Sequence, residues 1–219
     1  MDTTSLVIWD WNGTLFDDVA VSIETINHLL TRHNYAPLAG LGDYHAKFCF
    51  PILQYYKNLG IDFERTSFQD MAQEFMEIYH TLSAHCCLQP DAETTLSILQ
   101  KQGIHQVLLS ASMQQHLERQ VDCFPIRSYF DQLLGIRNIY AKSKLYLATH
   151  FIADCGVDPR RVVFVGDSVH DNEVATACGC DCVLYCGGHQ SRKALLDTGR
   201  TVIESLNELI EYCCPDGIR

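Results

Sequence analysis

Basic residues are scarce in this chain, and it has no long apolar segment. The 219 residues include 16 Lys and Arg against 27 Asp and Glu, which gives a formal net charge of −11. No run of Lys or Arg is longer than two residues, so nucleic acid is not predicted as a substrate. No apolar stretch approaches the roughly 20 residues of a membrane helix, and no basic region precedes the short apolar run near the N-terminus. These absences predict a cytoplasmic protein with no membrane partner.

Cysteine is abundant, but its spacing is not that of a disulfide framework. There are 11 cysteines, an odd number at irregular intervals, which favours free thiols in a reducing compartment. The alternating Cys178, Cys180 and Cys182 could be metal ligands. However, the segment CDCVLYC is typical of a buried strand, and zinc sites normally have two separated ligand pairs. We therefore expect these thiols to pack in the core.

Apolar runs and amphipathic segments alternate over most of the chain. The runs typical of strands are 5–10, 105–110, 161–167, 181–185 and 199–203. Segments with helical spacing lie between or after them, at 91–102, 113–121, 143–153, 172–178 and 206–213. This alternation predicts an α/β fold, with a Rossmann-like parallel sheet covered by helices on both faces.

The interval between the first and second strands departs from this alternation. Residues 35–85 contain no convincing strand, and helices are expected at 17–33, 51–58 and 67–82. We therefore predict a small all-helical cap domain, residues 16–85, inserted after the first strand. Residues 1–15 and 86–219 would form the α/β core.

Polar side chains follow three of the predicted strands. They are Asp10, Asn12 and Thr14 after the first strand, Ser110 and Ser112 after the second, and Asp167 and Asp171 after the third. Because ligands of open parallel sheets bind beyond the carboxyl ends of the strands, these groups should meet at one edge. Carboxylates gathered there would repel one another without a hard cation, and their oxygen atoms suit Mg²⁺.

Taken together, these segments resemble the motifs of haloacid dehalogenase-like hydrolases. Asp10-Trp11-Asn12-Gly13-Thr14 resembles the first motif, Leu109-Ser110 the second, and Val165-Gly166-Asp167-Ser168 with Asp171 the fourth. The third motif is a lone lysine, for which Lys144 fits best and Lys142 second. A helical cap after the first motif is similar to the layout of the phosphoglycolate phosphatase-like branch.

The resemblance implies a Mg²⁺-dependent phosphatase that acts on a small phosphorylated metabolite. Asp10 would attack phosphorus and form an aspartyl-phosphate. Ser110 and nearby backbone N–H groups would bind the phosphoryl oxygens, while Lys144 would neutralise charge. The implied Mg²⁺ ligands are Asp10, the backbone carbonyl of Asn12 and Asp167, with Asp171 supporting Lys144 or a bound water. The candidate substrate-binding residues are Gly13, Thr14, Ala111, Lys47 and Tyr55, and His189 and Gln190 could also reach the site.

Asn12 departs from the family pattern, which usually has Asp at this position. That Asp protonates the leaving group and then activates water, help that is typically worth about 10²–10⁴-fold. An amide makes similar hydrogen bonds but carries no titratable proton, and on sequence alone Asn12→Asp would restore one. The enzyme could be a phosphatase that uses another acid, or one whose leaving group needs little protonation.

Two other interpretations of Asn12 stay open. The chain could be a phosphonate (C–P bond) hydrolase similar to phosphonoacetaldehyde hydrolase, which requires a cap lysine in the region of Lys47 and Lys57 to form an imine. Alternatively, it could be a catalytically weak module that binds a phosphorylated metabolite or a protein. The oligomeric state is not predicted.

Overall fold

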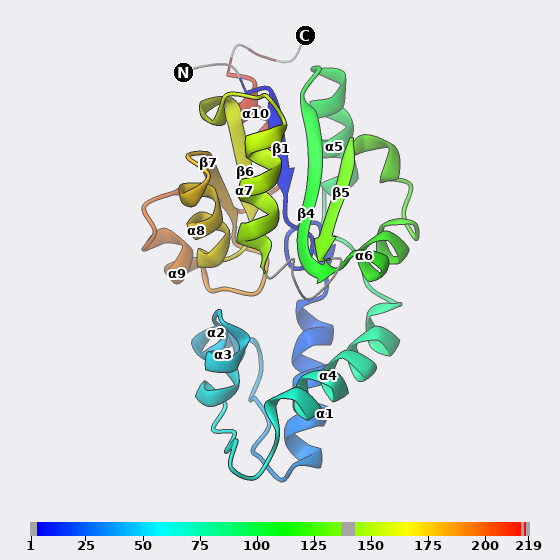
Figure 1. The fold of residues 1–219 in the computed structure, drawn as a ribbon, viewed down its shortest axis with the longest axis vertical. Helices are drawn as coiled ribbons and strands as arrows, with labels where there is room; N and C mark the ends of the chain where they lie inside the picture. Colours follow the sequence, from blue (N-terminus) through cyan, green and yellow to red (C-terminus); the bar gives the residue numbers. More distant parts are fainter. Residues whose placement is uncertain (1–3, 137–142, 216, 218–219) are drawn as a thin grey trace.

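The computed structural model describes residues 4–136, 143–215 and 217. Its centre is a six-stranded parallel sheet with the strand order β5-β4-β1-β6-β7-β8. β1 lies between β4 and β6, and Figure 1 shows the ends of the strands directed toward a separate group of helices. The strands are β1 (Leu6–Trp9), β4 (His105–Met113), β5 (Gln132–Ile136), β6 (Val162–Gly166), β7 (Asp181–Tyr185) and β8 (Thr201–Ile203).

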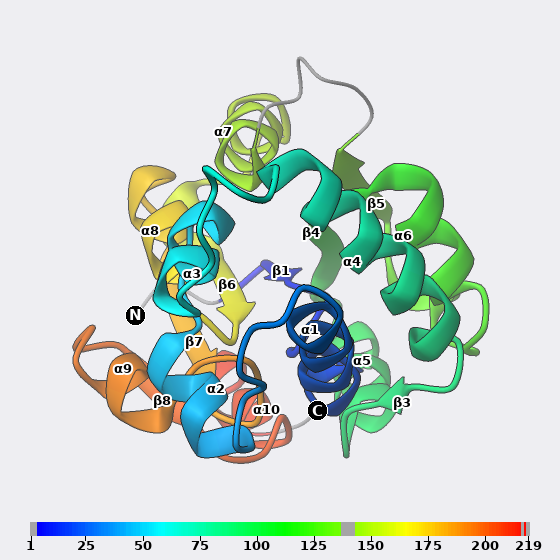
Figure 2. The ribbon, with the colours of Figure 1, turned by 90° about the horizontal axis from the view of Figure 1, so that it is seen from below.

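Helices cover both faces of this sheet. Side chains alternate along β1, so Val7 and Trp9 pack into one hydrophobic cluster while Leu6 and Ile8 pack into another. The first cluster includes residues of α5 (Ala92–Lys101), α6 (Gln114–Val121) and α10 (Glu208–Cys213). The second includes residues of α7 (Lys144–Asp154), α8 (Val169–Ala177) and α9 (Arg192–Leu196). The predicted α/β class with a covered parallel sheet is confirmed, and Figure 2 shows the two layers from the side of the strand ends.

The helical cap follows β1 and has a hydrophobic cluster of its own. It contains α1 (Val19–Arg32), α2 (Leu41–Lys47), α3 (Ile52–Asn58) and α4 (Phe68–Ser83). Ile26, Leu29 and Leu30 of α1 and Met71 of α4 are fully buried in this cluster. The chain enters and leaves the cap through two short antiparallel strands, β2 (Phe16–Asp17) and β3 (Cys87–Leu88). The two connections to the core therefore lie side by side.

Several elements were not predicted from the sequence. They are α2, α9, the β2–β3 pair, the edge strand β5 and the 3₁₀ turns Arg127–Tyr129 and Pro159–Arg161. β5 has the sequence QLLGI, which is short and does not alternate, and it is ordered by pairing with β4. Its Gly135 allows close approach, because a Cβ there would lie 2.8 Å from the Cα of Gln114. β4 also continues three residues beyond the predicted end at Ser110.

The described residues include no helix long and apolar enough to cross a membrane. The 11 cysteines are all described and none forms a disulfide. Cys180 and Cys182 are buried in the cluster that contains α7 and α8, which agrees with a packing role.

A buried hydrogen bond between Trp9 and Gln106 gives a test of the core. Trp9 Nε1 donates to Gln106 Oε1 at 3.1 Å, and Gln106 Nε2 donates to the Leu96 carbonyl at 2.9 Å. Trp9→Phe should lower the free energy of unfolding by about 2–4 kcal/mol, because it leaves a void and a buried oxygen without a donor. Denaturant titration measures this change. Trp9→Phe/Gln106→Met should cost less than the sum of the single changes, and strict additivity would contradict the assignment.

Candidate active site

The loop after β1 brings Asp10, Asn12 and Thr14 to the edge of the sheet. The Trp11 carbonyl accepts hydrogen bonds from the backbone N–H groups of Thr14, Leu15 and Phe16, which closes a tight turn. Gly13 has a φ of +76°, and a Cβ at this position would lie 2.3 Å from Asp167 Oδ2. Only glycine fits here without displacing that carboxylate.

Three carboxylates meet where β1 and β6 end. Oxygen atoms of Asp10, Asp167 and Asp171 all lie within 4.8 Å of one another. Asp171 is positioned by a capping box at the start of α8, in which Ser168 Oγ accepts from the Asp171 N–H and the Asp171 carboxylate accepts from the Ser168 N–H. The pairing of β1 with β6 therefore converts two distant sequence motifs into one acidic cluster.

Lys144 is the buried ammonium in this cluster. It begins α7, is 5% exposed, and forms ion pairs with Asp10 and Asp171. Burial would raise the pKa of Asp171, but Lys144 outweighs this effect and holds it below the usual value. Burial raises the pKa of Asp10 to about 6 despite Lys144, and that of Asp167 to about 7 despite His189. One ammonium therefore does not neutralise three carboxylates, and the excess negative charge suits a divalent cation.

The end of β4 adds hydroxyl groups to the site. Ser110 is buried, and its Oγ accepts from the Ser112 backbone N–H at 3.0 Å. Among the described residues no acceptor is found for the Ser110 hydroxyl hydrogen, which is free to meet a ligand oxygen. Ser112 Oγ donates instead to Asn12 Oδ1 at 3.1 Å.

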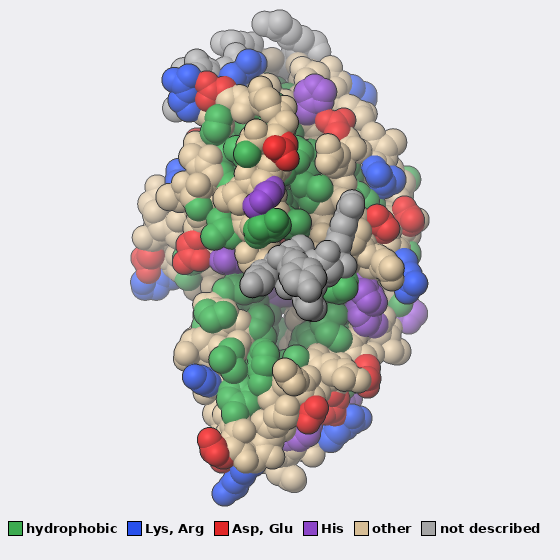
Figure 3. Space-filling model, in the orientation of Figure 1, with side chains coloured by type: hydrophobic (Ala, Val, Ile, Leu, Met, Phe, Trp, Pro, Cys, Tyr) green, Lys and Arg blue, Asp and Glu red, His purple; other side chains and the backbone are tan. Residues whose placement is uncertain are grey.

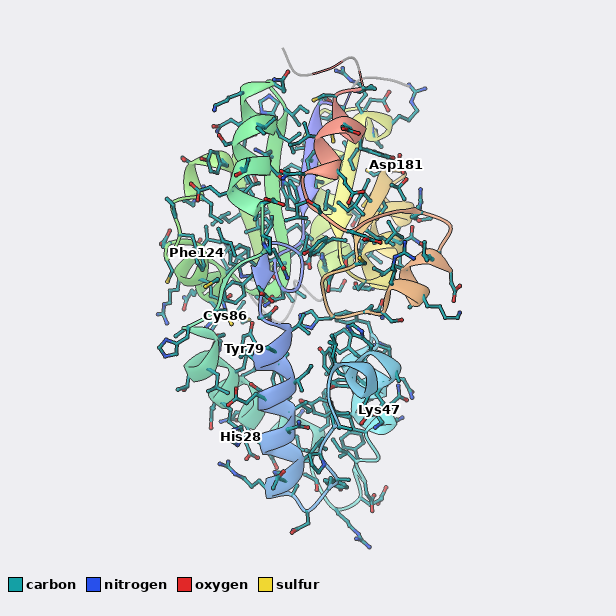
Figure 4. The ribbon with its side chains drawn as sticks, turned by 180° about the vertical axis from the view of Figure 1, so that it is seen from behind. His28, Lys47, Tyr79, Cys86, Phe124 and Asp181 are labelled. Atoms are coloured by element: carbon teal, nitrogen blue, oxygen red, sulfur yellow. The ribbon has the colours of Figure 1, made fainter. Side chains whose placement is uncertain are left out.

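Asn12 belongs to a second polar network that joins the core to the cap. Its Nδ2 donates to Asp18 Oδ2 at 2.9 Å and to the Tyr79 hydroxyl oxygen at 2.8 Å. The Tyr79 hydroxyl in turn donates to Asp18 Oδ2 at 2.5 Å. Figure 4 shows Tyr79 on α4 near the junction with the core. All the hydrogen-bonding groups of the Asn12 side chain are therefore occupied.

His189 closes this network from the loop after β7. Its ring Nε2 lies 3.2 Å from Asp18 Oδ1 and its ring Nδ1 lies 2.8 Å from the Tyr44 hydroxyl oxygen. The backbone N–H of His189 donates to Asp167 Oδ2 at 2.5 Å. Burial would lower the pKa of His189, but the Asp18 carboxylate outweighs this and raises it to about 9. Burial would raise the pKa of Asp18, but His189 and the hydrogen bond from Tyr79 stabilise its carboxylate and lower the pKa below the usual value. The two groups form a buried ion pair.

A cavity of about 410 Å³ opens between the acidic cluster and the cap. Of the predicted site residues, those that line it are Asp10, Asn12, Ser110, Ala111, Lys144, Asp167, Asp171, Tyr55 and His189. Gly13 and Thr14 are buried and do not line the cavity, and Thr14 Oγ1 lies 3.3 Å from Asp10 Oδ2. Hydrophobic side chains gather around the junction of cap and core on the face drawn in Figure 3.

Lys47 is not brought to this cavity. It lies on α2, as Figure 4 shows, and its ammonium pairs with Asp43 one helical turn away at 2.5 Å. The ion pair is the physical reason, because it holds the ammonium along the helix rather than toward the site. Gln190 also lies outside the cavity lining, and its Oε1 accepts from the Val169 N–H. Lys142, the second choice for the third motif, lies outside the described residues.

Sequence reasoning missed two residues of the site, Asp18 and Tyr79. Asp18 follows Asp17, and nothing in the sequence distinguishes the buried carboxylate from the exposed one. Tyr79 falls within the helix predicted at 67–82, among apolar residues. Its hydroxyl group was the available signal, because a buried tyrosine usually needs a polar partner.

The site is thus a carboxylate cluster with one lysine at the strand ends of a capped α/β fold. A family model for haloacid dehalogenase-like hydrolases matches residues 7–185. This chain therefore belongs to the haloacid dehalogenase-like hydrolase family.

Known proteins similar to this chain agree with the phosphoglycolate phosphatase-like branch. Phosphoglycolate phosphatase of Pseudomonas savastanoi pv. phaseolicola is 28% identical, and the match covers 95% of this chain and 79% of that protein. A haloacid dehalogenase-like family hydrolase from Streptococcus pneumoniae superposes with a TM-score of 0.83 at 14% identity, covering 97% of this chain and 99% of that one. CbbY from Rhodobacter sphaeroides, solved in complex with phosphate, has a TM-score of 0.72 at 17% identity, covering 94% and 96%. The two structural matches support the fold.

The buried pair of Asp18 and His189 predicts a pH-dependent contribution to stability. His189→Gln should lower the free energy of unfolding by about 3 kcal/mol at pH 6, because it leaves Asp18 buried without a cation. The pKa of His189 is raised from 6.5 to about 9, so this contribution is complete below about pH 6.5 and is lost as the pH rises through about 9. Denaturant unfolding at pH 6, 7.5 and 9.5 measures the difference.

His170→Gln is the matched control for this measurement. His170 also lines the cavity, but it pairs with the exposed Glu173, so its loss should cost less than about 1 kcal/mol. An effect of His189→Gln that is equal at all three pH values would rule out the ion pair as its cause.

Proposed function

We propose that this protein is a Mg²⁺-dependent phosphatase that acts on a small phosphorylated molecule through an aspartyl-phosphate on Asp10. The exposure of Asp10 to the cavity supports this proposal most directly. Its side chain is 12% exposed and lines the cavity, whereas that of Asp171 is 3% exposed and Asp167 is also buried. All three carboxylates line the cavity, and Asp10 is the one most exposed to a substrate there.

The surrounding side chains fit nucleophilic attack by Asp10. An oxygen of Asp10 bonds to phosphorus while the bond to the leaving oxygen breaks, and water later hydrolyses the aspartyl-phosphate. The Lys144 ammonium is paired with Asp10 and adjoins the position where the phosphoryl group would lie. The Ser110 hydroxyl can donate to a phosphoryl oxygen, so charge on the transferred group meets preformed donors.

The donor set of the site fits Mg²⁺. Asp10 and Asp167 would supply carboxylate oxygens, and the backbone carbonyl of Asn12 would complete the protein ligands. Asp171 adds a third carboxylate to the cluster and mainly holds Lys144. When bound, Mg²⁺ would polarise the phosphoryl group and offset the negative charge of the cluster. Burial raises the pKa values of Asp10 and Asp167, and a bound cation would stabilise their ionised forms.

The alternative functions receive less support. A phosphonate hydrolase needs a cap lysine for an imine, yet Lys144 is the only lysine among the described residues that line the cavity. A module that only binds a phosphorylated metabolite or a protein would not need a nucleophile held against a buried ammonium. We further propose residues 16–85 as the cap domain, with the remaining residues as the core. The cytoplasmic location stays a prediction of the sequence.

Replacing the nucleophile tests the proposal. Asp10→Asn should reduce phosphate release from phosphomonoesters by at least about 10³-fold, because an amide of the same size does not form the aspartyl-phosphate. Phosphate release and circular dichroism are measured on the same preparation. Asp17→Asn is the matched control, because Asp17 is exposed and should retain activity within about twofold. Comparable turnover by Asp10→Asn, with deamidation excluded by mass spectrometry, would refute the role.

Mg²⁺ binding should depend on pH. The pKa values of Asp10 and Asp167 are about 6 and about 7, so protons compete with the metal below neutrality. Calorimetric titration should show the Mg²⁺ affinity falling by about tenfold or more between pH 8 and pH 5.5. Asp167→Ala should weaken binding at pH 8, whereas Asp197→Ala, on an exposed side chain paired with Lys193, should not. Unchanged affinity in Asp167→Ala, or full activity in excess chelator, would contradict the site.

A further inference from the structure

The cavity beside Asp10 has two chemically different ends. Its core end carries the carboxylates, Lys144 and the serine hydroxyls. Its cap end is lined mainly by apolar and aromatic side chains, namely Phe48, Phe50, Ile52, Tyr55, Tyr56, Ala72, Phe75 and Met76. Among the described residues, no lysine or arginine of the cap lines this space. The imidazolium of His189, which also lines the cavity, is already paired with Asp18, so a carboxylated leaving group would lose its hydration at the cap end without meeting an unpaired lysine or arginine there.

Two of the four tyrosine hydroxyls around this space are not available to compensate for this. Those of Tyr44 and Tyr79 are already bonded to His189 and Asp18. The Tyr55 hydroxyl oxygen is buried and has no hydrogen-bond partner among the described residues. Tyr55 therefore lines the cavity mainly with its aromatic ring. The cap end consequently presents mostly ring surfaces and aliphatic groups, which favour an apolar and aromatic ligand.

Asn12 adds an independent constraint on the leaving group. Its two amide hydrogens are donated to Asp18 and Tyr79, and its oxygen accepts from Ser112. It has no proton to give to a departing oxygen, so this position favours a leaving group that departs as an anion. A phenol has a pKa of about 10. The pKa of an alkanol is close to that of water, which is about 15.7. A phenolate therefore departs without an acid far more readily than an alkoxide.

We propose that the substrates of this site are aryl phosphates, the phosphate esters of small phenols. This inference rests on the proposed phosphatase function and specifies its substrate class. An Asp10 oxygen bonds to phosphorus as the aryl oxygen–phosphorus bond breaks, and the phenolate leaves with the electron pair and takes a proton from water. Water then bonds to phosphorus, the bond to Asp10 breaks, and inorganic phosphate is released. The cavity of about 410 Å³ accommodates a phosphate group and a small aromatic ring system.

A matched set of substrates tests the proposal on the unaltered protein with Mg²⁺. Phenyl phosphate and benzyl phosphate carry the same ring, but only the first releases a phenolate. Phosphoglycolate is small, carboxylated and releases an alkoxide. We expect kcat/KM for phenyl phosphate to exceed that for either of the others by about tenfold or more. Substituted phenyl phosphates should show a steep dependence of rate on the pKa of the phenol.

Exchanging an amide and a carboxylate tests the role of Asn12. In Asn12→Asp alone, the new carboxylate would lie about 2.9 Å from Asp18, so a proton would be shared between the two acids rather than given to the substrate. Asn12→Asp is therefore expected to restore a proton donor only when Asp18 is also replaced. Asn12→Asp/Asp18→Asn moves the carboxylate while keeping the charge. It should lower the phenyl-to-benzyl ratio of kcat/KM by about tenfold or more, and Asn12→Asp should lower it less.

The apolar wall is tested by a substitution on α4. Met76 lines the cavity and is 39% exposed, so Met76→Gln should fold normally. It should raise KM for phenyl phosphate by about threefold or more, because a methionine side chain in contact with the ring is replaced by a polar amide. Glu77→Gln is the control, because Glu77 is adjacent on the same helix and does not line the cavity.

The outcomes separate this inference from the function on which it rests. Hydrolysis of benzyl phosphate as fast as phenyl phosphate, or a higher kcat/KM for phosphoglycolate, would overturn the aryl specificity. If Asp10→Asn abolishes the hydrolysis of benzyl phosphate or phosphoglycolate in that case, the phosphatase function stands. If no ester releases phosphate, both the aryl specificity and the phosphatase function are overturned. Because the substrate comparison needs no variant, it decides the question even if the double substitution does not fold.

Discussion

The ion pairs of the Lys144 ammonium with Asp10 and Asp171 join α7, the loop after β1 and the start of α8 at one point. Removing one partner from such a buried pair typically costs about 3–5 kcal/mol, because the remaining charge stays out of water. The rest of the site follows from bringing these charges together. Gly13 and Gly166 are needed because a Cβ at either position would meet Asp167 or Asp171. The capping box of Ser168 serves the same end by fixing the Asp171 carboxylate.

The amide at Asn12 is compatible with this crowding in a way that a carboxylate is not. Asp18 already places a buried negative charge within hydrogen-bond distance of residue 12, and His189 compensates that charge. A second carboxylate at position 12 would face Asp18 without a cation of its own. The departure from the family pattern is therefore matched by a local structure, in which Tyr79 of the cap also takes part.

The sequence allowed the main outline of the fold and of the acidic cluster to be predicted, because both depend on periodic patterns. Alternating apolar strands and helices indicated the sheet, and acids at the strand ends indicated where the ligand chemistry lies. The rest depends on contacts between distant segments. β5 is ordered by its neighbour β4, Asp18 is distinguished from Asp17 only by burial, and Lys47 is held by Asp43. The partners of Asn12 come from the cap, the core and the connection between them, and no local pattern predicts such a meeting.

The pairing of β2 with β3 has a consequence for how such a protein is assembled from parts. Phe16 lies opposite Leu88, so the segment between them starts and finishes at neighbouring positions on the core. A segment with adjacent ends can be lengthened, shortened or replaced without altering the sheet, as is usual for inserted domains. The nucleophile at the strand ends and most of the cavity lining opposite it thus come from different segments of the chain. Grafting another helical insert between Phe16 and Leu88 would retain the nucleophile and present it with a different molecular surface.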